Sequence, residues 1–134
     1  MRMEGRRRAA PAAAALALLL GGCAFMGEID RIEILGPDLT KAADGTWIGE
    51  WNTTLVSARV SVDTLSRRIV GIEILKHDCG KGRPAEAIVD RVIAAQSLAV
   101  DTVSGATGSS KVILRAIQDA LEKSVTAGGL EAAP

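Results

Sequence analysis

The sequence is poor in the residue types that build aromatic cores and metal sites. It has one Phe, two Trp and no Tyr among 134 residues, and His77 is its single His. A hydrophobic core must therefore come from Val, Ile, Leu and Ala, which suits strands and helices of modest size. A lone His indicates no metal site, because such sites gather several ligands.

The charge balance and the length exclude two further classes. Lys and Arg number 16, as do Asp and Glu. Without the four Arg and one Glu of residues 1–22, 12 basic and 15 acidic residues remain, a net charge of about −3. No basic patch is left to bind phosphates, so no nucleic-acid partner is expected. A chain of 134 residues suits one compact domain and is too short for two ordinary ones.

The N-terminus has the pattern of an export signal. Three Arg at positions 6–8 precede an apolar run from Ala9 to Leu20, which is shorter than the roughly 20 residues needed to span a bilayer. The run ends in Leu20-Gly21-Gly22-Cys23, which resembles the lipobox of bacterial lipoproteins, where the Cys thiol takes a diacylglycerol. We therefore expect a signal peptide at residues 1–22 and a lipid anchor at Cys23, on the extracytoplasmic face of the cell membrane. An ordinary signal peptide with an incidental Cys is the alternative.

Cysteine is otherwise almost absent. Cys79 is the second of two Cys, and lipidation of Cys23 leaves it without a partner for an intramolecular disulfide. We expect Cys79 to be a half-buried loop residue rather than a reactive thiol.

The segment after the lipidation site is expected to be an extended linker. Ile29, Ile32 and Ile34 are spaced as on a strand, and Gly36-Pro37 breaks the run. Residues 23–43 are therefore assigned to the lipidated Cys and this linker.

Three stretches predict an antiparallel meander. Asp44-Gly45 marks a turn, and strands are expected at Thr46–Trp51, Val56–Val62 and Ile69–Leu75, where apolar and polar residues alternate. In the first strand the alternation places two sets of side chains on opposite faces: Trp47, Gly49 and Trp51 on one, and Thr46, Ile48 and Glu50 on the other.

Two helices are expected to follow. The first begins near Pro84, at a position that tolerates the missing N–H, and runs to about Gln96. The second covers Ser109–Ser124, with apolar residues at helical spacing, and Gly128-Gly129 ends it. The sequence thus predicts an α+β fold, an antiparallel sheet with two packed helices, in a single small domain at residues 44–125. Residues 126–134 are expected to form a flexible tail.

A loop of small residues connects these helices. Gly105 and Gly108 allow the backbone to approach a ligand closely. Thr107, Ser109 and Ser110 supply hydroxyl groups, and the unpaired N–H groups of the helix start favour an anion such as phosphate. A serine-capped helix after a flexible turn explains the same residues equally well.

The loop also carries a family motif. Asp101-x-x-Ser104-Gly105-Ala106-Thr107 matches the motif of the FMN-binding domain family, which includes the flavinylated subunits of sodium-pumping NADH:quinone oxidoreductase and of Rnf-type complexes. Asp44-Gly45-Thr46-Trp47-x-Gly49-Glu50 resembles the DGTYxGE opening of that family, with Trp where Tyr is usual. The stretch His77-x-x-Gly80-x-Gly82-x-x-Ala85-Glu86, followed by Gln96-Ser97, resembles the small single-domain lipoprotein branch. The likeness covers roughly residues 44–123.

The resemblance implies a cofactor and a partner. A flavin transferase, magnesium-dependent and active outside the cytoplasm, would take FAD and esterify its FMN phosphate to the hydroxyl of Thr107. Further cofactor contacts are expected from the rest of the loop, namely Asp101, Ser104, Gly105, Ala106, Gly108 and Ser109. Asp101 either orients the loop or assists the transfer, or is only a turn-forming residue.

Other side chains could approach the flavin ring. His77, Lys81 and Arg83 would there stabilise the anionic reduced form by their positive charge; the alternative is a solvated basic loop. Trp47 and Trp51 could stack on the isoalloxazine ring or pack in the core.

The resemblance implies an electron carrier rather than an enzyme with its own substrate. The flavin would do the chemistry between a membrane redox partner and an extracytoplasmic acceptor, while the protein sets its potential and orientation. One alternative is a small reductase that binds FMN without a covalent bond and needs a substrate cleft. Another is a lipoprotein binding module without redox chemistry, which uses the loop for an anion or a partner.

Overall fold

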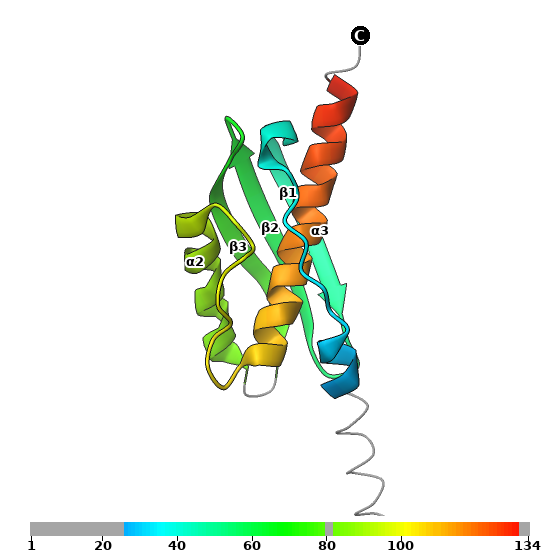
Figure 1. Cartoon of the computed structure of the whole chain (residues 1–134), viewed down its shortest axis with the longest axis vertical. Helices are drawn as coiled ribbons and strands as arrows, with labels where there is room; N and C mark the ends of the chain where they lie inside the picture. Colours follow the sequence, from blue (N-terminus) through cyan, green and yellow to red (C-terminus); the bar gives the residue numbers. More distant parts are fainter. Residues whose placement is uncertain (1–25, 80–81, 132–134) are drawn as a thin grey trace, which may run out of the picture.

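Three strands form an antiparallel sheet in the order β1-β2-β3, and helices cover one face of it (Figure 1). A computed structural model describes residues 26–79 and 82–131 of the chain. The predicted α+β fold, with an antiparallel sheet and packed helices, is confirmed. The elements are η1 (Leu39–Lys41), β1 (Gly45–Asn52), β2 (Ser57–Leu65), β3 (Arg68–Asp78), η2 (Arg83–Ala87), α2 (Ile88–Ala95) and α3 (Thr107–Glu131).

The central strand, β2, carries the inner face of the sheet. Its alternating residues Ala58, Val60 and Val62 are buried and face the helices, as the period of two predicts. The register with β3 shifts between Arg59 and Val60 and again between Asp63 and Thr64, so that Val60 and Val62 pair with Ile74 and Ile72 of β3.

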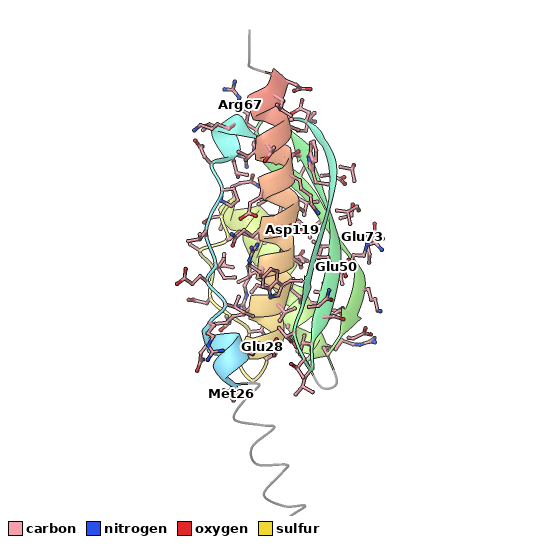
Figure 2. All side chains as sticks on the ribbon, turned by 90° about the vertical axis from the view of Figure 1, so that its right-hand side faces the viewer. Met26, Glu28, Glu50, Arg67, Glu73 and Asp119 are labelled. Carbon is pink, nitrogen blue, oxygen red and sulfur yellow. The ribbon has the colours of Figure 1, made fainter. Side chains whose placement is uncertain are left out.

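The long helix α3 lies antiparallel to β1 and in direct contact with it. A Cβ atom on Gly49 would overlap the carbonyl oxygen of Ala116 and lie 2.6 Å from the nitrogen of Ala120, so only Gly fits between strand and helix. Glu50 N–H donates to Asp119 Oδ2 over 3.0 Å, and Figure 2 shows these two labelled residues on facing elements. The β1 face predicted to hold Gly49 is therefore the face that packs on α3.

The predicted first helix is split into two elements. Arg83–Ala87 forms the 3-10 helix η2, with Pro84 in its first turn, and α2 follows directly. Gln96 ends α2 in a left-handed conformation, and its side-chain amide bonds both the N–H and the carbonyl oxygen of Ile69 at 2.8 Å. These two bonds fasten the end of α2 to the start of β3.

The expectation of an extended linker is wrong at residues 26–30 and at the 3-10 helix η1, whereas residues 32–38 belong to no helix or strand. Residues 26–30 are helical, and Ile29 and Ile32 are buried in the core. Ile32 lies just after the helix, and its N–H donates to the carbonyl oxygen of Ile29 over 3.1 Å, so a helical turn separates the two residues, whereas a strand would space inward side chains by two. Further along, Leu35 N–H donates to Gln118 Oε1 over 2.8 Å, so the segment packs along α3. Cys23 and the predicted signal peptide lie outside the described residues.

The expected end of the second helix at Gly128-Gly129 is also wrong. α3 begins at Thr107, continues through both Gly residues and ends at Glu131, so residues 126–131 are helical rather than a flexible tail. Gly128 is needed for close contact, because a Cβ atom there would overlap the carbonyl oxygen of Lys41 and lie 3.0 Å from the nitrogen of Ala43. No helix within residues 26–79 and 82–131 combines the length and the hydrophobicity of a membrane span.

The two adjacent Gly residues provide a matched test of this packing. Gly129→Ala meets no atom within 4 Å and should raise the free energy of unfolding by about 0.5 kcal/mol, because Ala is the better helix former. Gly128→Ala should lower it by about 2 kcal/mol through overlap with the backbone at Lys41. Urea unfolding of both variants measures the difference. Equal stabilisation by both would show that the 41–43 segment does not pack on α3 in solution.

Candidate functional site

The loop before α3 is held in shape by its own backbone. Ala106 N–H donates to the carbonyl oxygen of Val103 over 2.9 Å, closing a turn. Gly105 occupies that turn with φ +77°, in the left-handed region that other residues rarely adopt. The motif therefore needs Gly at position 105 because the turn requires this backbone conformation.

The hydroxyl groups of the loop divide into an exposed and a buried set. Ser110 is buried, and its Oγ donates to the carbonyl oxygen of Ala106 over 2.8 Å and accepts from Val103 N–H over 3.0 Å. Ser109 is buried as well. Thr107, the first residue of α3, is exposed, as is Ser104. Ser110 thus holds the loop in shape through its hydrogen bonds. Thr107, at the helix start, is exposed and can be reached by a reaction partner.

The beginning of the loop is tied to α2. Arg91 Nη1 donates to the carbonyl oxygens of Asp101, over 2.8 Å, and Thr102, over 3.3 Å. Asp101 itself is exposed, which agrees with either of its expected roles. The sequence did not indicate that Arg91 supports this loop. Its partners are backbone carbonyl groups, which every residue carries, so no particular residue type marks the contact.

A second loop reaches the first turn of α3. A Cβ atom on Gly82 would overlap Ser109 Oγ and lie 2.8 Å from Ser109 Cβ and 3.2 Å from Cys79 Cβ. Gly82, directly before η2, therefore lies against the motif helix, and a side chain at this position would not fit. Cys79 is half-buried and packs against the core, as expected. Lys81 lies outside the described residues.

His77 is buried rather than solvated. Its side chain is 1% exposed, and its Nδ1 lies 3.2 Å from Glu86 Oε1 on η2. Within the described residues, its buried Nε2 has no hydrogen-bond partner. His77 pairs with Ala58 of β2 near the end of β3, next to the loop that contacts Ser109. The solvated-loop alternative is therefore excluded for His77. Its partner Glu86 was not identified from the sequence as part of this pair.

The two Trp side chains have protein partners. Trp47 Nε1 donates to Thr64 Oγ1 over 2.8 Å, and Trp47 packs against the core, so its core alternative holds. The guanidinium of Arg115 lies 4.4 Å from the centre of a Trp51 ring, a cation–π contact. A cavity of about 430 Å³ adjoins this pair, and Gln118 is among the other residues that line it.

The charges near the end of β3 are locally balanced. Hydrogen bonds from the Lys76 side chain and from the Ser57 hydroxyl hold the pKa of Asp78 below its usual value.

Among residues 26–79 and 82–131, no three His, Cys, Asp or Glu side chains are grouped as a metal site would need.

The site suits a phosphate-bearing cofactor attached at its surface. It offers an exposed Thr as the first residue of a 25-residue helix, whose first N–H groups have no partner within the helix. The motif and Gly82 bring two loops to this point. In comparisons with known proteins, the family model of the FMN-binding domain matches residues 52–122, more than half of the chain and both loops. No curated protein and no solved structure matches the chain.

Proposed function

Because the chain belongs to the FMN-binding domain family, we propose that it is a membrane-anchored, extracytoplasmic electron-transfer protein whose FMN is bonded covalently to Thr107. Membership of this family indicates that the chain binds a flavin and that the flavin is FMN. The covalent bond, the location and the electron-transfer role are the proposed part.

The exposure of Thr107 is the observation that carries the proposal. Of the three hydroxyl residues at the start of α3, Ser109 and Ser110 are buried and Thr107 is exposed. The first turn of a helix stabilises negative charge through its unpaired N–H groups, so a phosphodiester at Thr107 gains a favourable environment. Ser104 is exposed too, but it precedes the helix by three residues.

The attachment is a group transfer without a redox change. Thr107 Oγ forms a new bond to the FMN phosphorus of FAD while the pyrophosphate bond breaks. The bridging oxygen leaves with AMP, and the hydroxyl proton goes to the leaving phosphate. A flavin transferase is the partner that would bring FAD and catalyse this step.

The protein's own residues position the attachment point. Ser110 and Arg91 hold the loop, and Gly105 lets it turn, so that Thr107 faces outward. The bound flavin would accept and donate electrons. His77 and Lys81 are also proposed neighbours of the flavin; in support, His77 lies two residues before Cys79, whose Cβ would lie 3.2 Å from a Cβ atom on Gly82 beside Ser109.

The anchor and the partners belong to the same proposal. Lipidation of Cys23 would hold the protein at the extracytoplasmic face of the cell membrane, where a membrane redox partner could exchange electrons with it. The support is the sequence Leu20-Gly21-Gly22-Cys23 after an apolar run.

Intact mass after co-expression with a flavin transferase in an exporting host tests the proposed function. The protein should gain the mass of one FMN less one water, and its yellow colour should survive denaturation. An unmodified protein that binds FMN loosely and turns over NADH with a soluble acceptor would favour the reductase. A protein without any flavin would favour the binding module.

A further inference from the structure

The end of the domain that carries Thr107 is also the end at which the described chain begins. β1 and α3 are antiparallel, and Trp51 near the end of β1 contacts Arg115. The eight residues of α3 before Arg115 therefore extend about 12 Å further, toward the turn between β1 and β2. Figure 1 shows residues 26–30 beside this start of α3, whereas α3 ends at the far end of the domain.

Hydrogen bonds fix this arrangement. Lys111 Nζ donates to the carbonyl oxygen of Ile29 over 3.4 Å, which links the first turns of α3 to the 26–30 helix. Thr54 N–H, in the turn between β1 and β2, donates to the Glu28 carboxylate over 3.1 Å. The 26–30 helix, the β1–β2 turn and the Thr107 loop thus share one end of the molecule, which we term the anchor end. In Figure 2, Met26 and Glu28 lie at this end and Arg67 at the opposite one.

The anchor end presents apolar side chains next to the predicted lipid. Met26 is 58% exposed, and Leu55, which adjoins Thr54, is 62% exposed. A single exposed apolar residue is ordinary on a protein surface. Here, however, Cys23 precedes Met26 by only three residues, so its Cα atom lies within about 11 Å of Met26.

We propose that the anchor end rests on the lipid surface, with Met26 and Leu55 among the headgroups and the Thr107 loop facing the membrane. This orientation rests on the lipid anchor of the proposed function. The short tether restricts which surfaces of the domain can reach the bilayer, and at this end Met26 and Leu55 offer exposed apolar side chains to the headgroups. A flavin on Thr107 would then exchange electrons with a partner embedded in the membrane rather than one on the far side of the domain.

Leu55, just before β2, and Leu65, at the end of β2, allow a matched test. Leu65 ends β2 and is 55% exposed, close to the value for Leu55, yet ten residues of mostly extended chain place it about 30 Å away. Each is replaced by Cys in the lipidated chain carrying Cys79→Ser, and the new Cys is labelled with a fluorophore. Thr107→Val in both proteins removes flavin absorbance, so the result does not depend on flavin attachment.

Vesicles of phosphatidylcholine containing a nitroxide-headgroup lipid then quench labels that lie near the surface. Quenching of the label at position 55 should exceed that at position 65 several-fold, and Cys23→Ser should abolish it. Equal quenching at the two positions, or quenching that survives Cys23→Ser, would overturn the proposed orientation. An unlipidated Cys23 in the intact mass would overturn it too, whereas the flavin measurement above would be unaffected.

Discussion

Thr107→Val protein, co-expressed with a flavin transferase and exported, should fold normally and carry no covalent flavin. Val keeps the shape and nearly the volume of Thr but removes the oxygen that forms the phosphoester. Thr107 is exposed, so the free energy of unfolding should change by no more than about 0.5 kcal/mol. Intact mass and the absorbance of the denatured protein measure the loss, which should be complete.

Two variants of the same loop complete this experiment. Thr107→Ser retains a hydroxyl and should keep part of the covalent flavin. Ser110→Ala should keep the flavin but lower the free energy of unfolding by about 1–3 kcal/mol, because the Val103 N–H loses its acceptor. Denaturation-resistant flavin on Thr107→Val would show that the bond forms at another residue.

Gly49→Ala should be among the most destabilising single substitutions in the domain. The added methyl group would overlap the carbonyl oxygen of Ala116 and crowd the nitrogen of Ala120, both backbone atoms that cannot turn away. Either α3 moves away from β1 or the strand shifts, and we expect a loss of about 3 kcal/mol in the free energy of unfolding. Urea unfolding of the flavin-free protein measures it.

Gly71→Ala is the matched control on β3. Its Cβ atom would lie 3.2 Å from Asp63 Oδ2, a side-chain atom of an exposed residue that can shift by a few tenths of an ångström while its other oxygen keeps the hydrogen bond from Thr46. The free energy of unfolding should therefore change by no more than about 0.5 kcal/mol. A loss equal to that of Gly49→Ala would mean that Gly is needed for strand geometry in general rather than for contact with α3.

Periodic patterns predicted most of the fold. Alternation in β2 located its buried face, because residues two apart share one side of a strand. The 26–30 helix was missed because a few Ile residues are compatible with either period until their burial is known. The full length of α3 was missed because Gly128 was interpreted as a helix end, whereas its role depends on Lys41, far away in sequence.

The motif predicted where the candidate site lies but not what supports it. The place of the loop just before a helix followed from small residues ahead of an apolar period, but the helix begins at Thr107, two residues before the predicted start at Ser109. The contact of Gly82 with Ser109 and the pairing of His77 with Glu86 join separate elements. A single sequence carries no signal for such contacts, so only the folded chain reveals them.

The hydrogen bonds of Ser110 have a consequence for the order of events during maturation. Val103, Ala106 and Ser110 bond to one another, so the loop reaches its shape without any contribution from a cofactor. The loss of backbone entropy, about 1 kcal/mol for each ordered residue, is then incurred when the chain folds. A transferase would therefore bind a loop that is already folded rather than a disordered peptide. It should therefore recognise the folded domain, and a synthetic peptide of residues 101–110 should be a poor substrate.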